Sequence, residues 1–150
     1  MKKYKIKSKE SSLLNEPIVA YAASDDNTSI SVIKQMRSGI GINRFLQLVE
    51  DTPFSLKEWS KFLHISERSI ERYAKGQKSF EPLQSEKILQ ITMLYKFGLE
   101  VLETKENLDE WFNANILALG NQKPKQFLDT AFGINMVKNV LGRIQHGIFT

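Results

Sequence analysis

Hydrophobic positions along the chain recur at helical spacing and predict a series of amphipathic helices. Two helical pieces are expected between residues 29 and 50, with Gly39 and Gly41 interrupting them. Their apolar faces are Val32, Ile33 and Met36 in the first piece and Phe45, Leu46 and Val49 in the second. Pro53 is expected to end the second piece, because proline cannot continue the backbone hydrogen bonds and restricts the residue before it.

A short helix is expected to follow from residue 55. Ser55 and Glu58 have the spacing of a capping box, with the serine at the N-cap and the glutamate three residues later. Leu56, Trp59 and Leu63 then recur at i, i+3 and i+7, which predicts a buried stripe. Trp59 is therefore expected inside the core and not on a ligand-binding surface.

A second short helix is expected over residues 67–75. Ser66 is its N-cap and Gly76 its end, after a tight break at 64–65. The apolar side chains of this helix are expected to pack on the helix before it: Ile70, Tyr73 and Ala74. Two short helices joined by such a break have the pattern of a helix-turn-helix, whose second helix enters the major groove of DNA.

The polar side of this second helix is rich in basic residues. Between Lys61 and Lys78 there are five basic residues and two acidic ones, Glu67 and Glu71, so positive charge gathers where DNA phosphates are expected. Arg68 and Arg72 are four residues apart and share a side, and guanidinium groups pair with guanine edges or phosphates. The alternative is a solvated helix face. The DNA-binding candidates are Lys61, Ser66, Arg68, Ser69, Arg72, Lys75 and Lys78.

The rest of the chain is expected to be helical as well. A long helix is predicted from Pro82 to about residue 97, with Gly98 at its end, followed by helices at about 108–112, 124–129 and 134–146. The inward residues of the long helix are expected to be Leu83, Ile88, Ile91 and Tyr95. Strand-like alternation is absent, so the fold class is all-α. Three parts are expected: a basic arm over 1–28, a helix-turn-helix portion over 29–80 and a second helical portion over 81–150.

Composition and charge narrow the function classes. Hydrophobic residues make up 41% and charged residues 25%, and the net charge of +4 with a pI near 9.2 permits nucleic-acid binding without requiring it. With no cysteine, disulfides and thiol catalysis are excluded. The basic start Met1-Lys2-Lys3 is not followed by an apolar run, and no stretch is long enough to span a membrane, so a cytoplasmic protein is expected.

Catalytic or metal-binding patterns are missing from the sequence. His64 and His146 lie in unrelated segments without metal-ligand spacing. The pair Asp109-Glu110 suits the positive end of a helix dipole and not a spaced acid–base couple. Gly39 and Gly41 do not form a phosphate-binding loop, because no strand precedes them and no Gly-Lys-Ser follows. We therefore expect neither an enzyme nor a cofactor.

The C-terminal segment ends on Gly147, Ile148 and Phe149 before Thr150, without a polar tail. Apolar residues at a chain end are expected either to dock on the core of the chain or to bind a partner. Gly142 lies inside the last predicted helix, where glycine costs about 1 kcal/mol relative to alanine. A small residue there suggests close packing, either between two helices of the chain or with a partner.

The C-terminal pattern resembles the toxin-binding domain of Xre/MbcA/ParS-type antitoxins over roughly residues 108–150. The residues that carry the resemblance agree in order and spacing: Trp111, Asn113, Ala118-Leu119-Gly120, Pro124, Leu128, Thr130, Gly133, Val137, Leu141-Gly142-Arg143-Ile144 and Gly147. The stretch from Ser66 to Tyr73 resembles the helix-turn-helix of the same family. The chain departs from the family at three places, where it has Arg72-Tyr73, Gly120-Asn121 and His146.

The resemblance implies an antitoxin that covers the active-site entrance of a RES-domain toxin, an enzyme similar to ADP-ribosyltransferases that acts on NAD or transfers ADP-ribose. It also implies repression of the antitoxin's own operon through operator DNA, as a homodimer or a higher hetero-assembly. Carried onto this chain, the toxin-binding candidates are Asn115, Leu119, Gly120, Pro124, Arg143, Gly147, Ile148 and Phe149.

Two other functions remain open from the sequence. One is a stand-alone helix-turn-helix transcriptional regulator whose C-terminal part only dimerises. The other is a structural adaptor that does not bind DNA. A small toxin-like enzyme in the adjacent reading frame would favour the antitoxin over the stand-alone regulator.

Overall fold

The computed structural model describes residues 26–147, and over that range the chain forms seven α-helices and two short 3₁₀ helices. They are α1 (Asp26–Ser38), α2 (Ile42–Asp51), α3 (Leu56–Leu63), α4 (Glu67–Gly76), α5 (Pro82–Leu102), α6 (Lys105–Asn113), η1 (Leu117–Leu119), η2 (Pro124–Phe127) and α7 (Ala131–Gln145). Two isolated β-bridges, Gly41 with Ser79 and Ile116 with Gln122, accompany them. The expected all-α fold is confirmed.

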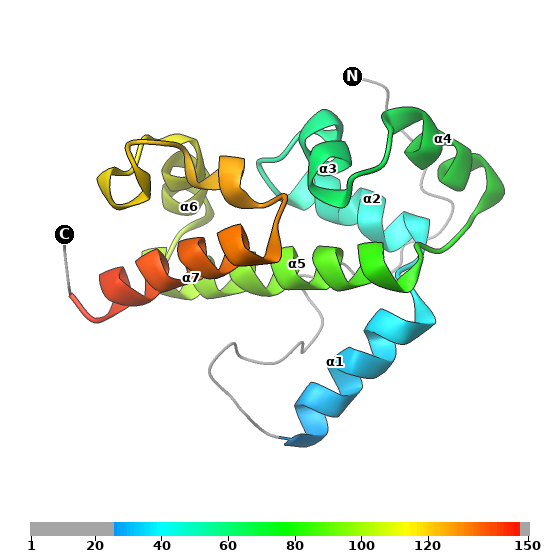
Figure 1. The fold of residues 1–150 in the computed structure, drawn as a ribbon, viewed down its shortest axis with the longest axis horizontal. Helices are drawn as coiled ribbons and strands as arrows, with labels where there is room; N and C mark the ends of the chain where they lie inside the picture. Colours follow the sequence, from blue (N-terminus) through cyan, green and yellow to red (C-terminus); the bar gives the residue numbers. More distant parts are fainter. Residues whose placement is uncertain (1–25, 148–150) are drawn as a thin grey trace.

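Helix α5 runs along the length of the molecule (Figure 1). Helices α2, α3 and α4 lie over its N-terminal half, α6 and α7 lie over its C-terminal half, and α1 packs beneath it in that view. A helix covered on several sides needs apolar residues around most of its circumference. The buried residues of α5 meet this need: Ser85, Ile88, Leu89, Ile91, Thr92, Leu94, Tyr95, Phe97 and Gly98.

One hydrophobic core runs through both halves of the molecule. Phe54, in the loop between α2 and α3, makes edge-to-face ring contacts with Trp59 of α3, Tyr95 of α5 and Phe112 of α6, at centroid distances of 6.0, 6.4 and 5.1 Å. The expected boundary near residue 80 therefore marks the start of a shared helix and not a gap between two cores.

One predicted helix end is wrong, and a second shifts by one residue. Helix α5 continues past Gly98 to Leu102, because Gly98 is buried in the helix interior, where a Cβ would press against the side chain of Leu108. Helix α4 includes Gly76, and the left-handed residue that ends it is Gln77, with φ 49°. Glycine often ends a helix, but at position 98 it allows close packing against Leu108 instead.

Several predicted boundaries and faces also shift. Helix α1 begins at Asp26, inside the range expected to be a flexible arm, and residues 1–25 lie outside the described part of the chain. Helices α6 and α7 start earlier than expected, after the N-caps Thr104 and Thr130. Ile33 and Leu83, expected to face inward, are 43% and 74% exposed.

Candidate interaction surfaces

The first helix of the helix-turn-helix is capped as its sequence predicts. The Ser55 hydroxyl accepts a hydrogen bond from the backbone N–H of Glu58 at 3.1 Å, and the backbone N–H of Ser55 donates to Glu58 Oε2 at 2.9 Å. Trp59 and Leu63 are buried on the inner side of α3, as expected. His64 ends the helix in a left-handed conformation with φ 55° and turns the chain toward α4.

Helix α4 presents two different faces. Ile70 is fully buried and Ala74 packs against the core. The Tyr73 ring meets Phe80 at 5.3 Å, instead of packing only on α3 as expected. The side chains proposed for DNA lie on or next to the opposite face and are exposed apart from half-buried Ser69: Lys61, Ser66, Arg68, Ser69, Arg72, Lys75 and Lys78.

The two serines of this set also hold the start of α4. The Ser66 hydroxyl accepts a hydrogen bond from the backbone N–H of Ser69 at 3.1 Å, and the two hydroxyls lie 3.0 Å apart. Acceptor oxygens at an N-cap satisfy backbone donors that a helix leaves unpaired. Ser66 and Ser69 therefore fix the direction of α4, while the arginines and lysines supply charge.

The far end of α4 is tied to α2. The Gln77 carbonyl oxygen Oε1 accepts from Asn43 Nδ2 at 2.8 Å, and the backbone N–H of Ile42 donates to the Lys78 carbonyl at 2.9 Å. The buried Ser85 hydroxyl accepts from the backbone N–H of Ile40 at 2.9 Å. Helix α4 is thus held at both ends, so its basic face keeps a fixed direction relative to the core.

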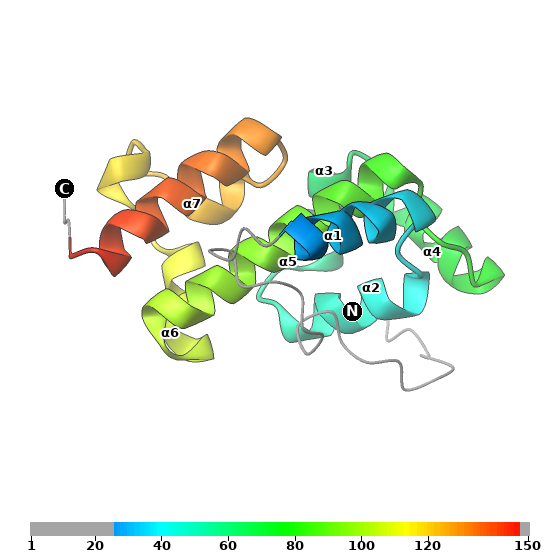
Figure 2. The same ribbon diagram turned by 90° about the horizontal axis from the view of Figure 1, so that it is seen from below.

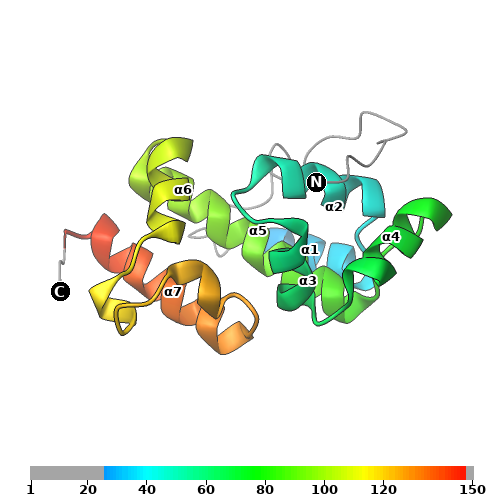
Figure 3. The same ribbon diagram turned by 90° about the horizontal axis from the view of Figure 1, so that it is seen from above.

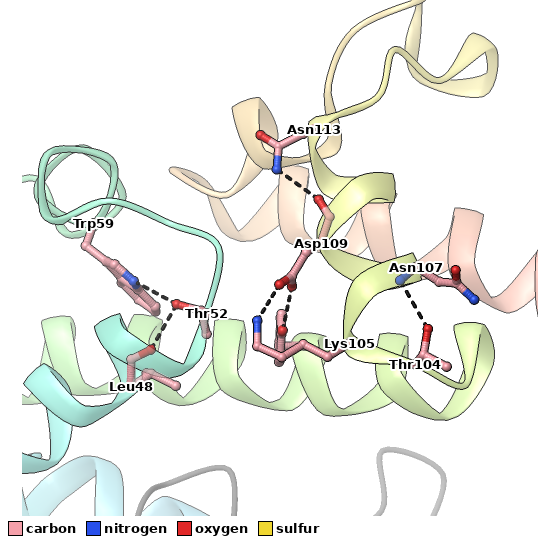
Figure 4. Close-up of polar contacts among 9 residues, drawn as sticks. Leu48, Thr52, Trp59, Thr104, Lys105, Asn107, Asp109 and Asn113 are labelled. Atoms are coloured by element: carbon pink, nitrogen blue, oxygen red, sulfur yellow. Dashed lines mark hydrogen bonds and ion pairs between the residues drawn. The ribbon is translucent and has the colours of Figure 1, made fainter.

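Polar contacts fix α6 onto α5 and α3 onto α2 (Figure 4). Asp109 of α6 accepts from the Tyr95 hydroxyl at 2.7 Å and pairs with Lys105. Burial raises the pKa of Tyr95 well above its ordinary value, and the hydrogen bond to Asp109 and nearby carboxylates add to this effect. Tyr95 therefore stays protonated as a hydrogen-bond donor. On α3, Trp59 Nε1 donates to Thr52 Oγ1 at 3.4 Å.

The loop between α6 and η2 places its leucines differently from the sequence prediction. Leu119, one of the residues carried over from the family resemblance, is buried with 3% exposure, whereas Leu117 is 78% exposed. The 3₁₀ turn of η1 ends at Gly120 with φ 67°, and the Ile116–Gln122 bridge closes the loop. Leu119 therefore supports the loop from inside. Sequence reasoning missed Leu117, since periodicity does not define a face in a single 3₁₀ turn.

The remaining C-terminal candidates differ in exposure. Asn115, Gly120, Arg143 and Gly147 are exposed, while Pro124 is buried at the start of η2. Ile148 and Phe149 lie outside the described residues. The expectation of close packing at Gly142 is wrong within the chain, because a Cβ there would meet no atom within 4 Å.

Two polar contacts join the helix-turn-helix to the C-terminal region, and a third joins α5 to the same region. Lys125 Nζ lies 2.6 Å from Glu58 Oε1. His64 Nε2 lies 2.8 Å from the backbone oxygen of Asp129, and Lys87 Nζ donates to the same oxygen at 2.9 Å. Burial lowers the pKa of Lys87, although the negative charges of Asp129 and Glu86 oppose that shift. The two candidate surfaces therefore belong to one connected body.

Within residues 26–147, histidine, aspartate and glutamate side chains form no group of three or more that could hold a metal ion. His64 instead binds a backbone oxygen, which is a structural role. None of the helices over the same range is long and apolar enough to cross a membrane.

Comparison with known protein families finds a match over the C-terminal region. The family described as the antitoxin Xre/MbcA/ParS C-terminal toxin-binding domain matches residues 98–147. Two curated relatives are each called "Antitoxin Xre". The C-terminal region of the chain is thus similar to the toxin-binding domain of Xre/MbcA-type antitoxins.

The similarity to these two relatives covers part of each chain. The protein from Photorhabdus laumondii is 28% identical over 102 residues, which is 62% of this chain and 69% of the relative. The protein from Yersinia enterocolitica is 28% identical over 87 residues, which is 57% of this chain and 59% of that relative.

A solved structure shares the fold of this chain. A chain in the crystal structure of the M. tuberculosis MbcT–MbcA toxin-antitoxin complex aligns with a TM-score of 0.53 and 15% identity. The alignment covers 80% of this chain and 96% of that one, so the likeness extends over both the helix-turn-helix and the C-terminal region.

Proposed function

We propose that this chain neutralises a partner toxin by covering the entrance to its active site with the region of residues 98–147. The match of this region to a toxin-binding domain is the observation that carries the proposal. Following the family resemblance, the partner is a RES-domain enzyme that consumes NAD or transfers ADP-ribose. The chain itself performs no chemistry and acts in the cytoplasm by occlusion.

The exposed residues of the region supply the proposed contacts. These are Asn115, Leu117 and Gly120 on the loop around η1, and Arg143 and Gly147 at the end of α7. The buried Leu119 and Pro124 shape this loop. Ile148 and Phe149, which lie outside the described residues, are proposed as further contacts, and apolar side chains of this size contribute about 1.5–3 kcal/mol each when fully buried.

Helix α4 is proposed to bind operator DNA and so repress the operon. Support comes from the exposed basic face and from the hydrogen bonds that hold both ends of the helix. Helix-turn-helix proteins read two half-sites as two-fold dimers, so repression is expected from a homodimer or from a larger assembly that includes the toxin.

Deletion of residues 147–150 tests the toxin-binding role. The deletion removes the exposed Gly147 and the apolar tail, while the helices of the described region remain. We expect helix content and operator binding close to those of the full chain, with toxin neutralisation abolished or greatly weakened. Growth during co-expression with the toxin from the adjacent reading frame, together with toxin pull-down, measures the effect. Full protection by the folded, truncated protein removes the tail from the mechanism.

A further inference from the structure

The outward face of α7 begins with Phe132, whose side chain is 79% exposed. No other large hydrophobic side chain in the described residues is as exposed. Asn139 and Arg143 follow seven and eleven residues later, about two and three helical turns, so they lie on the same face as Phe132. Asn135 and His146 are also exposed on this side, while Val137 and Leu141 point to the core.

The charge on this face has one sign. Helix α7 contains no aspartate or glutamate, and the charged residue on the Phe132 face is Arg143, since Lys138 lies on another side of the helix. The opposite corner of the same region is acidic, with exposed Glu100, Glu103, Glu106 and Glu110 at the end of α5 and on α6. Figures 2 and 3 show α6 and α7 on opposite sides of the C-terminal half of α5. The region is therefore polarised, and its α7 side suits an acidic partner.

We infer that the outward face of α7, from Phe132 to His146, binds the toxin through an apolar pocket bordered by aspartate or glutamate side chains. Phe132 fills the pocket and Arg143 pairs with its rim. This inference rests on the proposed function and adds Phe132 to it. The face lies within the stretch matched by the toxin-binding family. It includes Arg143 and ends next to Gly147.

A second copy of the chain fits this face less well than a toxin does. In a two-fold dimer, the same patch lies on both sides of the interface. The second copy then brings another Arg143 to the interface, and α7 has no acidic residue to pair with either arginine. Gly142 adds to the case for a partner, because the open space beside its Cα allows another chain to approach the backbone closely.

Substitution of Phe132 by alanine tests the inference, with Leu83→Ala as the matched control. Leu83 is 74% exposed but lies in α5 outside the matched residues. Binding is measured by calorimetry, using full-length chain and a catalytically inactive form of the adjacent-frame toxin. Phe132→Ala is expected to raise the dissociation constant by about 30-fold or more, because an aromatic side chain buried in an interface often contributes much of the binding energy. Leu83→Ala is expected to change it by less than about twofold.

Two further variants keep the result clear. Asn139→Trp places a bulky side chain on the same face without emptying the core, and it is expected to weaken binding even if Phe132→Ala proves unstable. Arg143→Glu is expected to slow association at low salt, with a smaller effect as salt increases.

The outcomes separate this inference from the proposed function. If Phe132→Ala and Asn139→Trp bind like the full chain while deletion of residues 147–150 prevents binding, the α7 face is not the contact and the proposed function stands. Equal losses for Leu83→Ala and Phe132→Ala also overturn the inference. If the unmodified chain does not bind the toxin, the proposed function falls together with the inference.

Discussion

Lys125 Nζ lies 2.6 Å from Glu58 Oε1 and so connects η2, in the proposed toxin-binding region, to α3 of the helix-turn-helix. The same Glu58 side chain completes the capping box of α3 through its second oxygen. One carboxylate therefore both starts a helix of the proposed DNA-binding unit and holds the neighbouring region against it.

Glu58→Gln is expected to reduce stability near neutral pH by up to about 1 kcal/mol, the usual range for a partly exposed ion pair. Burial of the Glu58 carboxyl raises its pKa, but Lys125 and the hydrogen bonds from Ser55 outweigh that effect and leave the pKa below its ordinary 4.5. The stabilisation is therefore fully present above pH 4.5 and is lost as the pH falls through the folded-state pKa.

Urea unfolding at a series of pH values measures this difference. The gap between Glu58→Gln and the unmodified chain is expected to shrink below about pH 4.5. Glu110→Gln, at an exposed position on α6, is the matched control and should unfold like the unmodified chain. A gap that stays constant down to the lowest pH argues against an ionic role for Glu58.

Trp59→Ala is expected to destabilise the fold by about 3–5 kcal/mol, because it empties a large, fully buried aromatic site. It also leaves the Thr52 hydroxyl without the indole donor. Trp111→Ala is a milder comparison, since Trp111 is half-buried. Thermal and urea unfolding compare the two, and equal small losses would show that the core does not depend on Trp59.

The two glycines of α7 are expected to respond oppositely to alanine. At Gly133 a Cβ would overlap the backbone oxygen of Phe127, so Gly133→Ala must displace η2 or the start of α7. At Gly142 a Cβ meets nothing within 4 Å, so Gly142→Ala is expected to stabilise the helix by about 0.4–1 kcal/mol. Chemical unfolding measures both; a destabilised Gly142→Ala variant would contradict the open space at that position.

The double variant Arg68→Ala and Arg72→Ala is expected to weaken operator binding while preserving the fold, because both side chains are exposed on α4. Each lost base contact costs about 1–3 kcal/mol. Lys34→Ala with Arg37→Ala removes the same charge from exposed positions on α1 and serves as the control. Gel shifts with the native upstream DNA measure affinity. Unchanged affinity in the α4 variant would remove the DNA role assigned to this helix.

Local signals in the sequence predicted much of the helix-turn-helix. The caps at Ser55 and Ser66 and the burial of Trp59 follow from side-chain chemistry within one or two helical turns, and the structure has all three. The outward position of Leu83 did not follow, because α5 is apolar on several sides and its sequence does not show which residues its neighbours leave uncovered.

The candidate toxin-binding surface was predictable only in part. The family pattern located the segment, but not the direction of each side chain. Leu119 turns inward and Leu117 outward within one short 3₁₀ turn, a choice set by the bridge between Ile116 and Gln122. Phe132 carries no periodic signal either, because its exposure depends on the early start of α7 after Thr130.

Inhibition of the partner toxin by the purified chain is the most direct measurement of the proposed function. The toxin from the adjacent reading frame is assayed for NAD consumption or ADP-ribose transfer while the full-length chain is added in increasing amounts. If the chain covers the active-site entrance, activity falls in proportion to the protein added and disappears at a fixed stoichiometric ratio. Undiminished toxin activity in the presence of a several-fold excess of folded chain would contradict the proposed function.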